Sequence, residues 1–496
     1  MESWDHTINT ALLGTEKRAL QKEALIPEVA EQFDLITAKT ESKEDVFLQT
    51  ASILSNIRQC GFTPLHKEGI SISKAEGEDK QYANELAHRV LYDILETTST
   101  RLFHFWLEQC VHANKIIQPE IIPLLFDEGM KNKSVRPLVY NCCGKRGAWL
   151  LQFNSEWRYV DTSTDEDLWQ TGVPEQRKNI LVELRKTDSV RARELLQQTW
   201  LQENATAKTE LLQQLQINAN ETDLPFLEEV LNEKSVKVKD AAIQILKIIP
   251  SSSIVQLYWR VLTPSIELKK EKTLLGLSNK TILNFVPVKE IDEAIYKTGI
   301  EKLSSDKKVL DQDYLVYQLL SSIPPYFLEQ HTGLPKEEVL KAIQYSRDGK
   351  YFISAITRSA IRFRDINWLK VLIAVQDQVF YPEVVATLPQ KEAEQYSLKH
   401  FDGDNAYPII NALGGFEKEW SFELTKAILK FTAKNPYQYH KGFYNQIVHS
   451  LPVQIISELE KCTPQEENLR TMWNNISEYI TYLLTLKLQT LKAFNE

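Results

Sequence analysis

The segment Ser235–Pro250, SVKVKDAAIQILKIIP, decides the fold. Its apolar residues recur at i, i+3, i+4, i+7, i+8 and i+11, at Val238, Ala241, Ala242, Ile245, Leu246 and Ile249. Because an α-helix turns once in about 3.6 residues, this spacing places all of them on one helical face. Pro250 cannot continue such a helix and ends it. The segment therefore predicts an amphipathic helix that packs against other helices.

A short polar motif with the pattern Ser-Val-basic occurs three times. The copies are Asn132–Arg136 (NKSVR), Thr187–Arg191 (TDSVR) and Glu233–Lys237 (EKSVK), and their serines lie 55 and 46 residues apart. Each copy follows an apolar segment and precedes an apolar helix, so Ser or Asp in the short turn is expected to cap the second helix. The spacing is near the roughly 40–47 residues of HEAT or armadillo repeats. We therefore predict an all-α fold, a HEAT/armadillo-like α-solenoid of irregular helix pairs.

Composition agrees with helix and excludes several classes of protein. The 496 residues include only 16 Gly, and alternating patterns of strand length are hard to find. With 58 Lys and Arg against 67 Asp and Glu, the net charge is −9, opposite to that of most non-specific nucleic-acid or anionic-membrane binders. The first residues do not resemble a signal peptide, and no apolar run approaches the ~18 residues of a membrane span. With five scattered cysteines, the expected location is the cytoplasm.

We expect four regions along the chain. Residues 1–80 form an N-terminal helical region with an exposed loop at 66–80, and residues 81–165 are helical and include the first repeat-like unit. An acidic connector, Asp161–Asp167, precedes HEAT-like repeats at 166–255. Pro-containing breaks similar to Ile249-Pro250 suggest that helical repeats continue through 256–496.

Motifs for catalysis or cofactor binding are missing from the sequence. Gly276–Thr281 lacks the second glycine of a phosphate-binding loop, and no Gly-x-Gly-x-x-Gly is present. His88, His104, Cys110 and His112 lie close in sequence, but Cys110 and His112 would point about 200° apart on a helix. We expect no catalytic residues, no cofactor and no metal site. The adjacent Cys142 and Cys143 are expected to fill a core.

Basic and aromatic residues near the repeat turns are the candidate partner-binding residues. They are Arg136, Arg146, Trp149, Trp157, Arg191, Arg193 and Lys237. If the repeats stack, the cations either form a ladder of ion pairs with Asp188, Glu194 and Asp240 or make a positive surface for an acidic partner. The tryptophans at 149, 157, 169 and 200 either fill a core junction or line an aromatic groove beside Arg146.

Several segments together resemble a known family. They are Ala11–Arg18 (ALLGTEKR), Gly144–Leu150 (GKRGAWL) followed by Asn154 and Trp157, and then Gly172, Arg177, Leu181, Arg185, Asp188, Ala192-Arg193, Trp200 and Asp223–Glu228. The chain resembles a bacterial family of unknown function with HEAT-like helical repeats. Its genes lie beside those for MoxR-type AAA+ ATPases, von Willebrand factor A proteins and SWIM zinc-finger proteins. Lys208 and Lys239 stand where the family pattern has arginine.

The resemblance implies a non-catalytic scaffold or adaptor, with a MoxR-type ATPase or von Willebrand factor A protein as its partner. The alternative is a helical-repeat protein that binds nucleic acid and is similar to the HEAT-like DNA glycosylases. Such a protein needs a carboxylate beside aromatic residues, which Asp161 near Trp149 and Trp157 would imitate. The negative net charge favours the protein partner.

Overall fold

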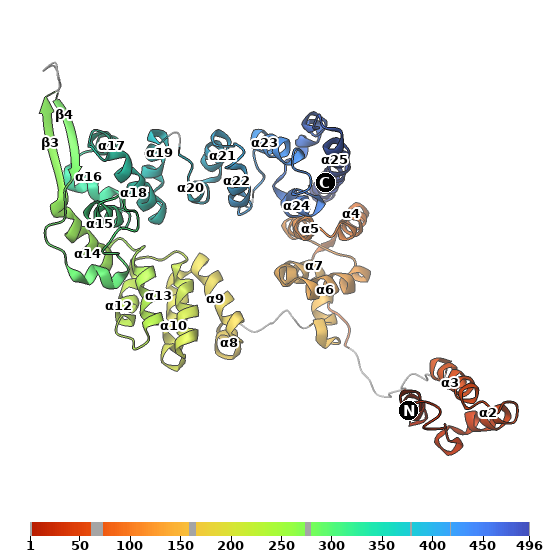
Figure 1. Ribbon diagram of the computed structural model, residues 1–496. Helices are drawn as coiled ribbons and strands as arrows, with labels where there is room; N and C mark the ends of the chain where they lie inside the picture. Colours follow the sequence, from red (N-terminus) through yellow and green to blue (C-terminus); the bar gives the residue numbers. More distant parts are fainter. Residues whose placement is uncertain are drawn as a thin grey trace. The chain divides into compact units, whose positions relative to one another are not determined.

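The computed structural model describes residues 2–60, 73–157, 165–272, 279–376, 379–416 and 418–495, and helix dominates them (Figure 1). The all-α prediction is confirmed. Two compact units, Met1–Lys74 and Ala75–Glu496, make up the chain. No helix among the described residues combines the length and the apolar character that crossing a membrane requires.

The first unit is a small helical body with its own core. Its helices are α1 (Glu2–Leu13), α2 (Pro27–Thr37) and α3 (Lys43–Cys60). Leu20, Leu25, Val29 and Leu54 form the buried cluster between them. The backbone N–H of Gly14 donates to the carbonyl of Thr10, and a positive φ of 86° at Gly14 ends α1.

The second unit begins with helices that pack against its last helix. These are α4 (Glu85–Glu96) and α5 (Thr100–His112), capped by Asn84 and Ser99, and both contact α25 (Glu467–Asn495). The indole ring of Trp106 packs edge-on against Phe494 at 5.2 Å. The Asn84 side-chain amide donates to the carbonyl of Ala493 over 2.9 Å. Two strands, β1 (Gln81–Tyr82) and β2 (Lys115–Ile116), form a short parallel pair beside them.

Each of the three Ser-Val-basic motifs joins two helices that pack against each other. The pairs are α6 (Ile122–Lys131) with α7 (Arg136–Leu150), α9 (Pro174–Thr187) with α10 (Ser189–Thr199), and α12 (Leu224–Val230) with α13 (Val236–Leu246). The apolar face predicted for α13 is buried. The caps are less uniform than expected. Asp188 accepts from the N–H of Arg191, whereas Ser235 makes no side-chain capping bond at α13.

A β-hairpin interrupts the helices, which the sequence did not predict. Strands β3 (Ile266–Lys272) and β4 (Asn279–Phe285) pair antiparallel, with Ile266 opposite Phe285. Strand β3 is largely exposed and carries charges on successive positions, so its sequence lacks a clean alternation of apolar and polar residues. The pairing is supported by tertiary contacts instead: Leu283 is buried, and the ring of Phe285 lies 4.8 Å from that of Phe352.

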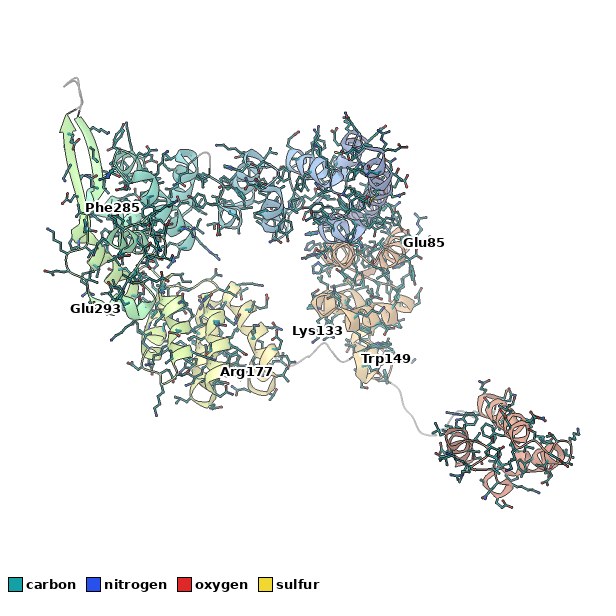
Figure 2. The ribbon with its side chains drawn as sticks, viewed as in Figure 1. Glu85, Lys133, Trp149, Arg177, Phe285 and Glu293 are labelled. Carbon is teal, nitrogen blue, oxygen red and sulfur yellow. The ribbon has the colours of Figure 1, made fainter. Side chains whose placement is uncertain are left out.

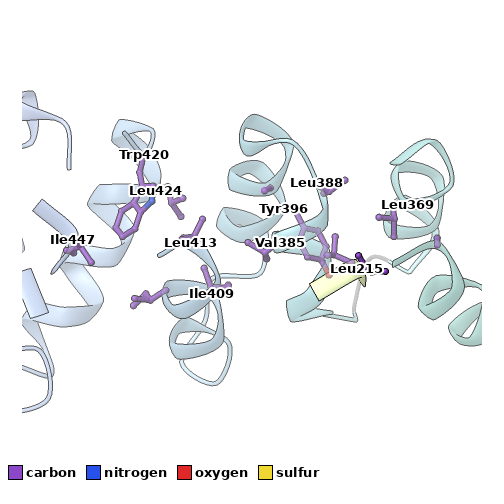
Figure 3. Packing of buried hydrophobic residues seen from close by; sticks show 14 of the residues in the cluster. Leu215, Leu369, Val385, Leu388, Tyr396, Ile409, Leu413, Trp420, Leu424 and Ile447 are labelled. Atoms are coloured by element: carbon purple, nitrogen blue, oxygen red, sulfur yellow. The ribbon is translucent and has the colours of Figure 1, made fainter. Parts of the chain in front are cut away.

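The other helices of the second unit contribute to one continuous core. Figure 3 shows part of it, around Leu369, Val385, Tyr396, Leu413 and Trp420. These helices are α8 (Asp165–Thr171), α11 (Ala205–Gln213), α14 (Ser253–Leu262), α15 (Asp311–Leu320), α16 (Tyr326–Thr332), α17 (Lys336–Gln344), α18 (Gly349–Arg362), α19 (Ile366–Val375), α20 (Pro382–Thr387), α21 (Gln390–Lys399), α22 (Ala406–Leu413), α23 (Phe422–Ala433) and α24 (Lys441–Ile447).

Candidate functional site

Gly144 divides α7 into two halves, and an acidic segment caps the second half. Its φ of 62° and ψ of −160° are accessible only to glycine. The backbone N–H groups of Lys145 and Arg146 donate to the Glu78 carboxylate over 3.0 and 2.7 Å. A Cβ added to Gly144 would lie 2.5 Å from a Glu78 oxygen. Glycine is therefore needed there both for the backbone conformation and for the close approach of the cap.

The predicted exposed loop at 66–80 supplies this cap. Residues 66–72 lie outside the described residues, and 73–80 are mostly exposed and not helical. Lys145 forms an ion pair with Asp79 at 2.7 Å and lies 3.7 Å from Glu76. These carboxylates raise the pKa of Lys145, with the hydrogen bond that its ammonium donates to Asp79 as the largest cause. The basic segment that starts at Lys145 is thus partly neutralised by its own chain.

Arg146, Trp149 and Phe153 follow one another at three- and four-residue spacing after the kink. The ring centroids of Trp149 and Phe153 are 4.8 Å apart in an edge-to-face arrangement, and 51% of Phe153 is exposed. The side chain of Arg146 is exposed, and within the described part of the chain its guanidinium meets no carboxylate. Figure 2 labels Trp149 on this surface. We call these three residues the Arg146 surface.

The remaining tryptophans of the predicted cluster have structural contacts. Trp157 donates to the carboxylate of Asp127 over 2.9 Å, and its ring lies against Phe126. Trp169 is buried beneath the guanidinium of Arg177, which is 4.4 Å from the ring centroid (Figure 2 labels Arg177). Trp200 is also buried. Asp161, which the nucleic-acid alternative requires, lies outside the described residues.

The predicted basic residues differ in what they contact. Arg136 donates from Nε to the carbonyl of Gly129 over 2.8 Å, and Arg191 binds both oxygens of Glu166 and lies 3.6 Å from Glu194. Arg193 donates to the carbonyl of Thr222 over 2.6 Å. Lys237 is exposed, with no ion pair to any described residue.

Neighbouring helices group these basic residues into separate sets. Arg191 and Arg193 share α10, whereas Arg136 and Arg146 belong to α7, which packs against α5 and α6. Lys237 lies on α13, which packs against α11, α12 and α14.

A buried ion pair lies beneath the α9–α12 region. Arg185 and Asp223 have no exposed side-chain surface and bond through two parallel N–H···O contacts of 3.0 and 2.8 Å. The other three N–H groups of Arg185 donate to the carbonyls of Ser189, Leu215 and Ile217. All five donors of the guanidinium are used. The pair connects α9, the start of α10 and the segment before α12.

A second polar cluster joins Lys208, Trp200 and Glu233. The Lys208 ammonium lies 4.8 Å from the centroid of the Trp200 ring and donates to Glu233 over 2.6 Å. The indole N–H of Trp200 donates to the same carboxylate oxygen over 2.9 Å. These bonds, the Lys208 bond foremost, lower the pKa of Glu233. The lysine replaces the arginine of the resembled pattern and still makes a cation–π contact and an ion pair.

The histidines and cysteines of the 88–143 region do not form a metal site in the described structure. No group of three or more potential ligands occurs among the described residues. Cys110, Cys142 and Cys143 are buried. A hydrogen bond with Cys110 and burial raise the pKa of Cys142 well above its usual value, and burial does the same for Cys143. The thiols of Cys142 and Cys143 therefore stay protonated and serve as core residues.

Two features with functional groups were not anticipated from sequence. One is Lys487, a fully buried lysine on α25 that donates to the carbonyls of His449 and Leu451 and to Glu419, each over 2.7 Å. In the sequence, the leucines at 483, 484 and 486 next to Lys487 could have indicated that this lysine is buried. The other is a cavity beside α18, whose lining comes from the end of α17, from α18 and α19, and from the segment before α20.

The described chain is a helical protein in which buried charge pairs join neighbouring helices and the Arg146 surface remains exposed. It belongs to the family of unknown function DUF5691, which matches residues 6–494. No curated protein and no solved structure matches the chain.

Proposed function

We propose that the protein is a non-catalytic scaffold or adaptor whose helix pairs form an irregular HEAT-like solenoid and which binds a protein partner through the Arg146 surface. The observation that carries the proposal is the edge-to-face pair of half-buried Trp149 and exposed Phe153, beside an arginine that meets no carboxylate among the described residues. Tryptophan, tyrosine and arginine are the residues most enriched among interface hot spots. Exposed aromatic area is costly in water, so a partner that covers it gains free energy.

The solenoid arrangement is supported by the succession of packed helices from α8 to α25, in which most helices contact their neighbours in sequence. Repeat architectures of this kind present extended surfaces to partners. The partner that the resemblance implies is a MoxR-type AAA+ ATPase or a von Willebrand factor A protein. An acidic segment on that partner would complement Arg146.

The test compares partner recovery by variants of the tagged protein in its native host. Arg146→Glu combined with Phe153→Ala is expected to reduce recovery of the partner at least tenfold, because it removes both an aromatic contact and a charge contact. The matched control is Arg260→Glu combined with Tyr437→Ala, which changes an exposed arginine and an exposed tyrosine on other helices and segments. Mass spectrometry of the recovered proteins identifies the partner.

Equal recovery by the folded Arg146 variant would contradict this surface as the binding site. Recovery of neither an ATPase nor a von Willebrand factor A protein would contradict the proposed partner. Tight binding of duplex DNA with a steep salt dependence would favour the nucleic-acid alternative.

A further inference from the structure

A cavity of 640 Å³ lies beside α18, at the end of α19 and the segment before α20. Apolar side chains of Ile353, Val375 and Val379 form part of its wall. Its volume is within the range of about 300–1,000 Å³ that small-molecule sites occupy, and such sites combine apolar walls with a few polar groups. The chemistry of its polar groups therefore indicates what it would bind.

Lys350 and Ser354 contribute polar groups from one face of α18. They are four residues apart, so their side chains lie one turn from each other along the cavity. The side chain of Lys350 is exposed, and its ammonium has no acidic partner among the residues that the structure describes. Ser354 already donates its hydroxyl proton to the carbonyl of Tyr351 over 2.7 Å.

Gln376, which follows α19, adds a further donor to the cavity lining. Tyr381 donates its hydroxyl proton to Oε1 of Gln376 over 2.6 Å, which orients the amide. With Oε1 engaged, Nε2 of Gln376 still has hydrogens to donate. Lys350 and Gln376 thus provide one cation and one neutral donor at an apolar cavity.

A second cation lies one turn farther along the same helix. Burial and Tyr317 raise the pKa of Tyr381, and the nearby guanidinium of Arg358 opposes them. Arg358 is four residues beyond Ser354, exposed, and without an ion pair to any described residue. The local excess of donors and positive charge is complementary to an anionic group.

We propose that this cavity binds a small amphipathic carboxylate, with its apolar body between Ile353, Val375 and Val379 and its carboxylate at Lys350. The apolar walls supply the hydrophobic contribution, and the ammonium supplies a charge-assisted hydrogen bond. The inference does not depend on the proposed adaptor role, because the Arg146 surface lies at the end of α7 and in the turn after it, whereas the cavity lies beside α18.

Octanoate is a suitable probe, since it has one carboxylate on an apolar chain, and octan-1-ol is its uncharged counterpart. Titration calorimetry on the full chain is expected to show octanoate binding about tenfold or more tightly than octan-1-ol, the difference expected of one hydrogen bond to a charged group. Lys350→Gln should weaken the binding of octanoate by about tenfold and leave the affinity for octan-1-ol unchanged.

Val375→Glu places a negative charge on the apolar wall and should abolish binding of both probes. Val375 is 36% exposed, so this variant is expected to fold, which its circular dichroism and melting temperature verify. Lys341→Gln on α17, an exposed lysine outside the cavity lining, is the matched control and should bind octanoate as the parent does.

Equal affinity for octanoate and octan-1-ol, or octanoate binding that is unaffected by Lys350→Gln, would overturn the proposal. So would failure of octanoate to bind while a short peptide of glutamate and leucine binds, because the cavity would then be a peptide-docking site.

Discussion

Arg185 and Asp223 form a bidentate salt bridge that solvent does not reach. The pair also organises its neighbours, because Asp223 accepts from the backbone N–H of Asn220 over 3.1 Å and lies 3.6 Å from Arg193. The Asp223 carboxylate therefore binds the buried Arg185, lies near the half-buried Arg193, and accepts a hydrogen bond from the turn at Asn220. Desolvation makes such a pair costly to form, but removing one partner leaves a buried charge without compensation.

We expect Asp223→Ala to lower the free energy of unfolding by about 3–5 kcal/mol, since Arg185 would remain buried and positively charged. Urea unfolding followed by circular dichroism measures this loss. Lys186→Ala is the control, because Lys186 forms an exposed pair with Glu183, and such pairs contribute about 0–1 kcal/mol. Equal effects of the two substitutions would contradict a structural role for the buried pair.

Gly144→Ala should destabilise the second unit by about 1–3 kcal/mol through its backbone conformation alone, and further through the contact with Glu78. The double variant, Gly144→Ala with Glu78→Ala, lacks the steric contact but keeps the backbone strain. The loss from Gly144→Ala should therefore be smaller when Glu78 is already alanine. Gly403→Ala is the control, because no heavy atom lies within 4 Å of its added Cβ. Thermal unfolding of Gly144→Ala, Glu78→Ala, the double variant and Gly403→Ala separates the backbone strain from the steric contact. If the losses of the two single variants simply add in the double variant, the steric contact with Glu78 contributes nothing.

Acid is expected to destabilise the protein in two pH ranges. Burial, assisted by the positive charges of Arg101 and Lys487, lowers the pKa of His449 to about 4. An unfolded histidine titrates near 6.5, so between these values the unfolded chain binds more protons and stability falls as pH falls. His449→Gln should flatten the stability profile between pH 6.5 and about 4, and His112→Gln, at an exposed site, should not. If His449→Gln left the dependence of stability on pH unchanged between pH 6.5 and about 4, protonation of His449 would not be its cause.

Protonation of Glu458 is expected to cause the loss of stability in the lower of the two pH ranges. Hydrogen bonds from Lys426 and Lys461 lower its pKa to about 2. Its contribution is complete above the unfolded value near 4.3 and is lost as pH falls toward 2. Glu458→Gln should reduce the pH dependence in this range only. Melting temperatures at pH 5, 4 and 3 check this, with Glu423→Gln on the exposed side of α23 as the control.

Lys487→Met is expected to destabilise the second unit by about 2–3 kcal/mol, because the carbonyls of His449 and Leu451 would lose a buried donor. Lys487→Arg keeps the charge but is longer and planar, so it should not restore full stability. Hydrogen exchange of α25 reports the effect locally, and protection equal to that of the parent protein in Lys487→Met would contradict the role of the ammonium.

Local patterns allowed most of the helices to be predicted, whereas contacts between distant segments could not be predicted. The face of α13 followed from spacing alone, since helical periodicity is a property of neighbouring residues. The hairpin of β3 and β4 was missed because Phe285 and Leu283 pack against helices more than fifty residues later. The partners of Arg191 and Arg193 were predicted only in part for the same reason: Glu194 was expected and lies beside Arg191, whereas Glu166 and Asp223 were not expected. The cavity beside α18 combines residues from separate elements and left no sequence motif.

The packing of α4 and α5 against α25 has a consequence for synthesis of the chain. Trp106 and Asn84 find their partners, Phe494 and Ala493, only after about four hundred further residues have been translated. Until then the apolar face of α4 lacks its main cover, and closing so long a loop is slow. We therefore expect the nascent second unit to pass through a stage in which α4 exposes apolar surface, and such surface favours aggregation.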